Sequence, residues 1–317
     1  MGERVITVWI NGATGFIGLN FIDSLLNTVD CNICVLAREK SNLDEITKRS
    51  LIKNKLSIVF DTQGYRGLFK KGDIIVNISG VQSEPQMEDK EYFEINTIKV
   101  QELLDQCPND IGLFLFISTI KVYGNHNDNP IQETSEYLGD NRYAISKSMA
   151  EKYIQQKSSI SDIPFCILQP VFVYGKGDKS GYVPKISSIL SKGVAPMIEN
   201  GTNRISFIHI SDLVAIMTSI VQQPKSVNGG VFITSYPEEV SLKKLYSLIC
   251  KNKKITPFYF NLPPFLIKIL KAISIISSNQ IYTLSQNMII NTNKIYDTLK
   301  IKPTVSIEKG IEMLFKD

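Results

Sequence analysis

The sequence predicts an α/β fold built on a doubly wound parallel sheet, with a smaller mixed region toward the C-terminus. Short apolar runs rich in β-branched residues alternate with helical stretches, and a glycine-rich turn follows the first of these runs. The composition agrees, because 317 residues that are 43% hydrophobic and 21% charged can form the core of one large domain or two coupled ones. Disordered and low-complexity chains are excluded.

Strands are expected where short runs of apolar, mostly β-branched residues lie between turn residues. They are at residues 5–10, 33–36, 56–59, 74–78, 113–117 and 165–173. Helices are expected between them, where apolar side chains recur every three or four positions. They are at residues 15–26, 91–106 and 143–158. This alternation predicts parallel strands with helices on both faces of the sheet.

The regular alternation ends at Gly175, where loop residues begin. A first domain is therefore expected over residues 1–175 and a smaller, mixed region over 176–317. Strand-like runs near 205–235, namely 205–210 and 230–233, are expected to return to the main sheet. The smaller region is then discontinuous.

Charge and cysteine content exclude several classes of function. The 35 Lys and Arg residues against 31 Asp and Glu residues give a net charge of +4 that is spread along the chain. Because the chain has no polybasic arm, no nucleic-acid partner is expected. The charge balance is still compatible with a mildly basic cleft that binds an anionic small molecule. The 5 cysteines are an odd number scattered over a long chain, which indicates reduced thiols rather than a disulfide framework.

No metal site is expected. Cys31 and Cys34 form a CxxC beside a predicted strand, where residues three apart point to opposite faces of the sheet. The 2 histidines, His126 and His209, have no cysteine or glutamate at a zinc-binding spacing.

Residues 262–276 are the best candidate for a membrane segment, but they are too few to span a bilayer and include Lys268 and Lys271. With Ser274 these lysines draw a polar stripe, which favours a packed amphipathic helix over one on a membrane surface. The first predicted strand begins near Met1 and leaves no room for a signal peptide. A cytoplasmic protein with no integral membrane segment is expected.

A glycine-rich turn, NGATGFIG at residues 11–18, follows the first strand and opens the first helix. This is the context that a dinucleotide fingerprint requires. Gly12 permits the tight turn, Gly15 lets a pyrophosphate approach the helix N-terminus, and Gly18 allows close packing of helix on strand. The residues of this turn expected to bind the cofactor are Gly12, Thr14, Gly15, Phe16, Ile17 and Gly18.

The end of the second strand predicts which dinucleotide binds. A carboxylate about 20 positions after the glycines would accept hydrogen bonds from a free ribose 2′-hydroxyl. The chain has Arg38 at this position, with Lys40 and Ser41 nearby. The nearest carboxylate, Glu39, lies slightly beyond the position where one would bind the ribose. A guanidinium suits the 2′-phosphate of NADP, because it binds phosphate through a planar fork. NADP(H) is therefore favoured over NAD, and a solvated loop arginine is the alternative interpretation of Arg38.

Tyr143 and Lys147 stand four residues apart in a predicted helix and therefore on one face of it. A free tyrosine has a pKa of about 10 and needs a neighbouring cation to act as an acid or base at neutral pH. Lys147 supplies that charge. The pair follows, in chain order, the glycine-rich turn and a strand that ends in Ser118 and Thr119. This order makes the YxxxK pattern far more specific than it is alone.

Taken in order, these motifs resemble the extended short-chain dehydrogenase/reductase superfamily, and within it the NAD-dependent epimerase/dehydratase group that acts on nucleotide sugars. The motifs are GxxGxxG at 12–18, Asn96, ISTIKVYG at 117–124 and YxxxK at 143–147. The resemblance implies a Rossmann-type enzyme in which Tyr143 is the acid/base and Lys147 its electrostatic partner. Thr119 is then the residue that hydrogen-bonds the reacting oxygen, and Ser118 is structural.

The resemblance also implies further binding residues. On the cofactor side they are Arg38, Asp61 against adenine, Thr62, Ser79, Gly80, Asn96, Tyr143, Lys147 and Pro170. On the substrate side they are Thr119, Tyr143, Phe172 and Arg204. Gln169 and Phe172 stand where better-known epimerases carry Arg and Asn, and Phe172 is similar to an apolar residue of 4-keto-sugar reductases. Arg204 is one position away from the usual diphosphate arginine, where this chain has Ile205.

The resemblance implies NADPH-dependent reduction of a nucleotide-linked 4-keto-6-deoxyhexose, such as a UDP-4-keto-6-deoxy-N-acetylhexosamine. Parts of the C-terminal stretch 261–311 are similar to enzymes that make N-acetylated 6-deoxyhexoses. An NAD-dependent UDP-hexose 4-epimerase is the alternative. A nonenzymatic NADP-binding regulator and a reductase of other small ketones are further alternatives. A homodimer is expected through the helices at 91–106 and 143–158.

Overall fold

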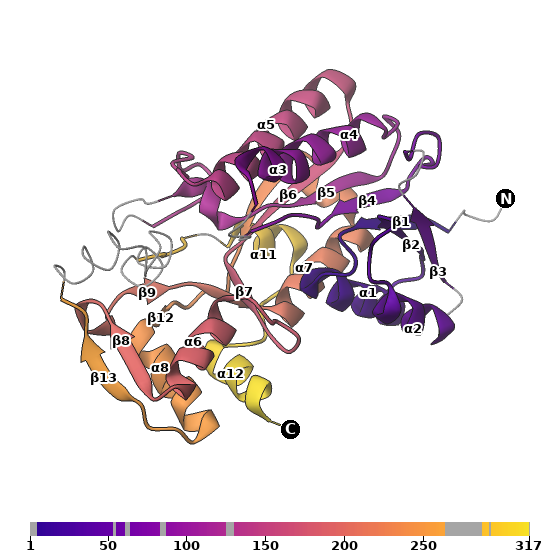
Figure 1. The fold of residues 1–317 in the computed structure, drawn as a ribbon. Helices are drawn as coiled ribbons and strands as arrows, with labels where there is room; N and C mark the ends of the chain where they lie inside the picture. Colours follow the sequence, from indigo (N-terminus) through magenta and orange to yellow (C-terminus); the bar gives the residue numbers. More distant parts are fainter. Residues whose placement is uncertain are drawn as a thin grey trace.

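The computed structural model describes residues 5–52, 55–60, 64–82, 87–124, 130–263, 287–291 and 293–316. Its centre is a 7-stranded parallel sheet in the order β11-β6-β5-β4-β1-β2-β3 (Figure 1). The strands are β1 Thr7–Asn11, β2 Asn32–Ala37, β3 Leu56–Phe60, β4 Ile74–Asn77, β5 Leu113–Ile117, β6 Phe165–Pro170 and β11 Gly230–Thr234. This is the Rossmann-type sheet that the sequence predicts.

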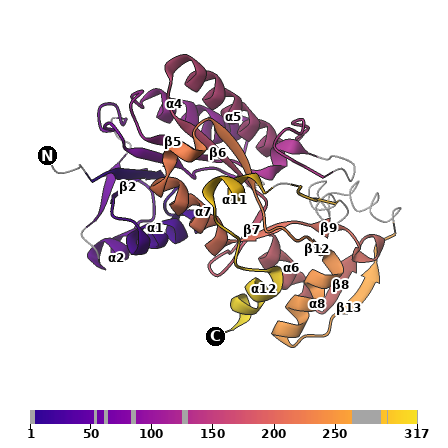
Figure 2. The same cartoon turned by 180° about the vertical axis from the view of Figure 1, so that it is seen from behind.

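Helices cover both faces of the sheet (Figures 1 and 2). They are α1 Phe16–Thr28, α2 Asp44–Ile52, α3 Asp89–Phe93, α4 Lys99–Asp105, α5 Arg142–Ser161, α7 Ile210–Gln222 and α11 Lys294–Leu299. Side chains of α1, α7 and α11 belong to the core on one face, and those of α4 and α5 to the core on the other face.

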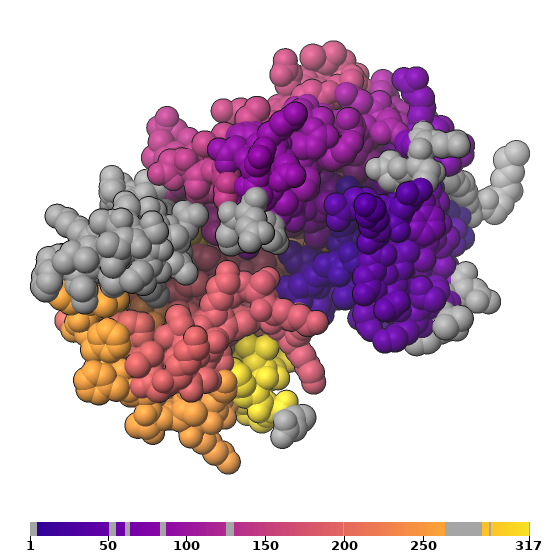
Figure 3. Space-filling view, in the orientation of Figure 1, coloured from indigo at the N-terminus to yellow at the C-terminus, as the bar shows by residue number. Residues whose placement is uncertain are grey.

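The strand order reverses at β1. From there the sheet extends through β2 and β3 on one side and through β4, β5 and β6 on the other. At such a switch point a crevice opens outside the carboxyl ends of the strands, because the connections leave in opposite directions. Figure 3 shows the surface hollowed where the indigo and purple sheet region meets the salmon segment that includes α6 Tyr182–Ser191.

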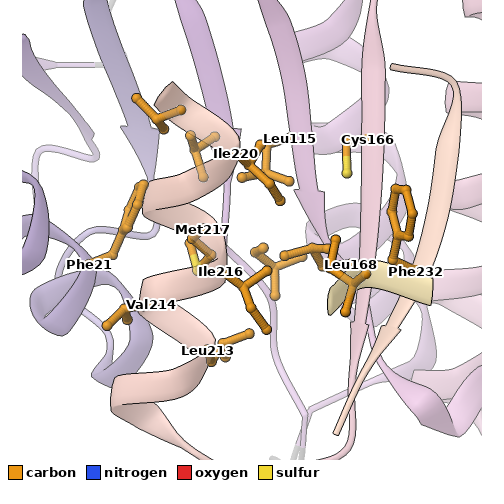
Figure 4. Close-up of a cluster of buried hydrophobic side chains, with 14 of the residues drawn as sticks. Phe21, Leu115, Cys166, Leu168, Leu213, Val214, Ile216, Met217, Ile220 and Phe232 are labelled. Carbon is orange, nitrogen blue, oxygen red and sulfur yellow. The ribbon is translucent and has the colours of Figure 1, made fainter. Parts of the chain in front are cut away.

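The strands divide their side chains between the two cores. Leu115 of β5 enters the core with α1 and α7, whereas Phe114 and Phe116 enter the core with α4 and α5. Successive residues of a strand point to opposite faces, so a wholly apolar strand is buried on both sides. Figure 4 shows the first core, where Ile216 of α7 lies close to Leu115 and Leu168. Complete burial of each such side chain stabilises the fold by about 2 kcal/mol.

Small two-stranded sheets and further helices form the C-terminal region (Figure 2). The strand pairs are β7 Phe172–Tyr174 with β10 Phe207–His209, β9 Arg204–Ile205 with β12 Val240–Ser241, and β8 Val194–Met197 with β13 Phe258–Asn261. Helices α6, α8 Leu242–Lys253 and α12 Ile307–Phe315 contribute to a third core around them.

Two expectations about strands are wrong. The run at 165–173 is not one strand, because β6 ends at Pro170 and β7 begins at Phe172 in a different sheet. Proline has no N–H to donate, and the Val171 N–H donates back to the Thr234 carbonyl of β11 at 3.1 Å. The run at 205–210 does not return to the main sheet. Its strand β10 pairs with β7, and these two strands form a separate sheet.

The helix expected at 91–106 is also more complex than predicted. It consists of α3, a π-helical turn Glu94–Ile98 and α4. The π-helical turn has one more residue than a turn of α-helix. The spacing of apolar residues does not reveal it, because the buried face of the helix continues through this turn. Helix α2 was not expected from the sequence.

Residues 264–276 of the expected amphipathic helix and His126 lie outside the described residues. Within the described ranges, no helix has both the length and the apolar character needed to cross a membrane. The cysteines are free and buried, and Cys31 and Cys34 enter different cores, so the prediction that they face opposite sides is confirmed. The described residues include no group of three or more His, Cys, Asp or Glu side chains that could hold a metal ion.

Candidate active site

The turn between β1 and α1 is packed tightly at two glycines and open at the third. Gly12 has φ +88°, and a Cβ there would lie 2.5 Å from the Ser79 nitrogen. A Cβ on Gly18 would lie 2.4 Å from the Gly12 carbonyl oxygen. A Cβ on Gly15 would meet only that same oxygen, at 3.5 Å. The backbone at Gly15 therefore has room on the side where a ligand would approach.

The N-terminus of α1 suits an anion. Its N-cap is Gly15, no side chain caps it, and its first turn contains no acidic residue. Thr14 and Gly15 are exposed, while Phe16 and Ile17 are half-buried. Unpaired N–H groups and the helix dipole leave partial positive charge at such an end.

An orphaned donor lies beside this helix end. Asn77, the last residue of β4, is fully buried, and its Nδ2 has no hydrogen-bond partner in the described structure. Its Oδ1 accepts hydrogen bonds from Asn11 Nδ2 at 3.1 Å and from the Ser79 N–H at 3.2 Å. A buried donor without a partner is costly to the fold. The open backbone at Gly15 and the uncapped N-terminus of α1 fit the phosphates of a dinucleotide.

Arg38 directly follows β2 and is exposed. Its backbone forms a short turn, in which its N–H donates to Ser41 Oγ at 3.1 Å and its carbonyl accepts from the Ser41 N–H at 2.9 Å. The guanidinium has no hydrogen bond or ion pair to any side chain in the described ranges. Asp61 and Thr62, the expected adenine-side residues, lie outside the described residues.

Lys147 lies on α5, one helical turn beyond Tyr143. It is almost completely buried, with 2% of its surface exposed. Its ammonium donates to the Ile117 carbonyl at 2.7 Å and lies 3.9 Å from the centroid of the Phe116 ring. A Cβ on Gly80 would lie 3.8 Å from Nζ, so the loop after β4 reaches the lysine. Burial lowers the pKa of Lys147 to about 7, and Glu151 opposes that change.

Tyr143 is half-buried near the start of α5. The helix begins there because Asn141 caps it, its Oδ1 accepting the Ala144 N–H at 3.0 Å. Burial raises the pKa of Tyr143 to about 12, and a hydrogen bond with the Thr119 side chain works against this rise. Thr119 follows β5, is 7% exposed, and accepts the Lys121 N–H at 3.3 Å. The structure thus brings Tyr143, Thr119 and Lys147 together at the carboxyl edge of the sheet.

Asn96 links the loop after β4 to α5 rather than facing open space. It is fully buried in the π-helical turn. Its Nδ2 donates to the Val81 carbonyl at 3.0 Å and to Ser146 Oγ at 3.1 Å, and its Oδ1 accepts the Val81 N–H at 2.8 Å. Both donors are used, so only the second lone pair of Oδ1 is left for a cofactor.

The expected substrate residues have different surroundings. Phe172 is half-buried and stacks on Tyr182 of α6, with 4.9 Å between ring centroids, which makes an apolar wall. Arg204 is exposed and pairs with Glu239 at 3.0 Å. Its neighbour Ile205 is buried, so the two side chains point to opposite faces of β9. The ion pair with Glu239 argues against a diphosphate role for Arg204.

A buried polar cluster behind Lys147 was not predicted from the sequence. It consists of Ser118, Tyr123, Tyr137, Glu151 and Gln169. The one available signal was the helical spacing, since Glu151 follows Lys147 by four positions on the same face of α5.

A Rossmann-type sheet with an open glycine turn, and with a tyrosine and a lysine one helical turn apart beside a threonine hydroxyl, defines a nicotinamide-dependent enzyme of the extended short-chain dehydrogenase/reductase type. The NAD dependent epimerase/dehydratase family matches residues 8–233, and the chain belongs to this family.

Relatives of known activity fall into several branches of that family. The chain is 27% identical over 256 residues to UDP-glucose 4-epimerase of Vibrio cholerae, covering 77% of this chain and 75% of the relative. It is 26% identical over 268 residues to dTDP-4-dehydro-6-deoxy-D-allose reductase of Streptomyces bikiniensis, covering 77% and 80%. The crystal structure of UDP-glucuronic acid 4-epimerase from Bacillus cereus with UDP-glucuronic acid and NAD has the same fold, with a TM-score of 0.81, 18% identity and 98% of both chains covered.

Proposed function

We propose that this enzyme uses NADPH to reduce the 4-keto group of a nucleotide-linked 4-keto-6-deoxyhexose. The observation that carries this proposal is Arg38, an exposed guanidinium at the carboxyl end of β2 with no carboxylate partner among the described side chains. Such a group favours the 2′-phosphate of NADP, and NADP exchanges between turnovers in a reductase. The apolar wall at Phe172 and the likeness to the Streptomyces reductase support the same reaction.

The site residues have distinct roles in this proposal. The bound cofactor supplies the hydride. Tyr143 donates a proton to the oxygen on C4 as the ketone becomes an alcohol, and Thr119 hydrogen-bonds that oxygen. Lys147, when charged, stabilises the tyrosinate that remains. The residues proposed to contact the cofactor are Gly12, Thr14, Gly15, Phe16, Ile17, Gly18, Arg38, Asp61, Thr62, Ser79, Gly80, Asn96, Tyr143, Lys147 and Pro170.

The test is loss of absorbance at the reduced-nicotinamide band when the enzyme meets NADPH or NADH and a UDP-4-keto-6-deoxy-N-acetylhexosamine. We expect turnover with NADPH that Tyr143→Phe reduces by about 100-fold or more. Absence of NADPH consumption with this and with a dTDP-linked 4-keto-6-deoxyhexose would contradict the proposal.

A UDP-hexose 4-epimerase that holds NAD is the second candidate. The likeness to the Vibrio cholerae epimerase and to epimerase structures solved with NAD supports it. Release of NAD from the denatured protein, with interconversion of two UDP-hexoses and no net NADPH use, would favour this candidate over reduction.

We also propose a homodimer in a reducing, cytoplasmic compartment. Ile98, Ile145 and Met149 are apolar yet 39%, 36% and 46% exposed, and Ile145 and Met149 follow one another by a turn of α5. A cluster of this kind on neighbouring helical segments is typical of a protein interface. The free, buried cysteines support the reducing compartment.

A further inference from the structure

Glu151 is completely buried on α5, one turn beyond Lys147 and two turns beyond Tyr143. Its Oε1 accepts a hydrogen bond from Ser118 Oγ, and its Oε2 accepts from the Tyr137 hydroxyl and from Gln169 Nε2, the last at 2.9 Å. These partners come from the end of β5, the loop before α5 and the end of β6. One carboxyl group therefore joins α5 to the two strand ends beside the reacting centre.

The hydrogen atoms of this cluster can be assigned. Tyr123 donates its hydroxyl proton to Gln169 Oε1 at 2.7 Å, so the two Gln169 N–H groups are left for Tyr137 at 2.8 Å and for Glu151. Because the Tyr137 oxygen accepts from Gln169, its own proton goes to Glu151. Every bond at Glu151 is then donated to it, and such donors favour the ionised form of the carboxyl group against the effect of burial.

The hydrogen-bond partners of Glu151 within the described ranges are all neutral, so none of them cancels its charge. The cation that acts on it is Lys147. Burial raises the pKa of Glu151 above its ordinary value, and the three donors and Lys147 offset part of this rise. Glu151 in turn raises the pKa of Lys147 against the effect of burial. The ionisation states of these two groups therefore support each other.

We propose that Glu151 is a positioning residue that keeps Lys147 protonated beside Tyr143 and holds the Ser118–Thr119 backbone in register with α5. This inference rests on the proposed function of Tyr143 and Lys147. The titratable groups near the pair are Tyr143 on the same helix, Tyr137 in the preceding loop, Tyr123 after β5, and Lys121, whose Nζ lies 5.7 Å from the Tyr143 ring centroid. Lys185 of α6 acts on Lys121.

The first test measures Lys147 directly and needs no substrate. In protein labelled with ¹³C at lysine Cε, the Lys147 resonance is assigned by its loss in Lys147→Met, and its shift is followed with pH. We expect Glu151→Gln to lower the Lys147 midpoint by about one pH unit or more. Ser148→Ala is the matched control, because it removes a hydroxyl group from the same helix, where Ser148 Oγ donates to the Ile145 carbonyl, and leaves every donor to Glu151 in place. We expect it to leave the midpoint within about 0.3 unit.

The result that would overturn the proposal is an unchanged midpoint in Glu151→Gln, or an equal change in both variants. If Glu151→Gln does not fold, the parent protein still decides, because a Lys147 midpoint below about pH 6 would mean that Glu151 does not keep it charged. Glu151→Asp keeps the charge and is expected to restore at least half of the change.

A kinetic measurement then separates this inference from the proposed function. Oxidation of the sugar alcohol needs Tyr143 as a base, and loss of the charge on Lys147 raises the pKa of that phenol. The pH at half-maximal rate should therefore rise in Glu151→Gln and stay constant in Ser148→Ala. A Lys147 midpoint that moves as expected in a protein without turnover on any nucleotide sugar would refute the proposed function and support the pairing of Glu151 with Lys147.

Discussion

Burial moves the pKa of Tyr143 and that of Lys147 in opposite directions, and both changes favour the neutral form of the side chain. The phenol is raised to about 12 and the ammonium is lowered to about 7. Tyr143 and Lys147 therefore depend on neighbouring groups to stabilise their charged forms. Thr119 and Glu151 are those neighbours in this chain.

Lys147→Met should show how much stability the buried ammonium costs. The folded pKa of about 7 lies below the unfolded value near 10.5, so the unfolded chain binds more protons between these values. The cost is complete below about pH 7 and disappears as the pH rises toward about 10.5. We therefore expect the parent to gain stability relative to the variant as the pH rises from 7 to 10, by a few degrees in Tm. Comparing the two pH values removes the separate loss of stability that comes from leaving Glu151 without its cation. A Tm of the parent that falls relative to the variant over this range would contradict the pKa direction of Lys147.

Arg38→Ala should test the choice of cofactor. Loss of a charged, forked contact to the 2′-phosphate is expected to raise KM for NADPH about 10-fold or more and to leave KM for NADH unchanged. Lys192→Ala is a suitable control, because it removes one exposed positive charge that lies outside this turn. Equal effects of Arg38→Ala on both cofactors would show that the arginine does not recognise the phosphate.

At this scale the sequence predicts the residues whose spacing is local. Tyr143 and Lys147 share one face of a helix, and Thr119 comes just after a wholly apolar strand. The periods of the helix and of the strand therefore predict that the three side chains lie together at the carboxyl edge of the sheet. The partners of Glu151 come from positions 118, 137 and 169, and no periodic pattern connects such distant residues. Asn96 was expected at the cofactor, but both of its amide hydrogens are donated within the protein.

The elements that position the site are those with the strongest sequence signals. Strands β1, β2, β4 and β5 and helices α1 and α5 lie within a few residues of their expected bounds, because each combines an apolar period with a clear turn or cap. The break after Pro170 and the π-helical turn at 94–98 depend on tertiary packing. Apolar residues alone carry no signal for them.

The turn before α1 offers a matched pair of variants. A Cβ at Gly18 would lie 2.4 Å from backbone oxygen and 2.7 Å from Ala13 Cα, so Gly18→Ala should lower the free energy of unfolding by about 1–3 kcal/mol. Gly15→Ala meets only an ordinary contact at 3.5 Å and should change it by less than about 1 kcal/mol. It should instead weaken NADPH binding, because the new methyl group stands where a phosphate approaches. Urea unfolding and a cofactor titration check the two effects separately.

At the scale of the whole molecule, the exposed apolar residues on the outer helices predict self-association. Met149→Asp should convert the proposed dimer to a monomer in analytical ultracentrifugation, since a buried, unpaired carboxylate at an interface is strongly unfavourable. Phe258→Asp provides the control, because Phe258 is 72% exposed on β13, away from α5. A parent protein that sediments as a monomer, or a dimer that survives Met149→Asp, would show that this face is not the interface.

Val171 is the single residue between the end of the main sheet and the start of β7. Its N–H is bound to the Thr234 carbonyl of β11, so it is itself held in place. Two Cα steps, about 7 Å, are therefore the greatest distance between Pro170, which we propose contacts the cofactor, and Phe172, which we propose contacts the sugar. A linker this short cannot absorb a change in sugar size by lengthening. In the proposed site, adaptation to a larger or smaller sugar would therefore fall on side chains such as Phe172 and its stacking partner Tyr182, which makes these two positions the first choice for redirecting the enzyme to another substrate.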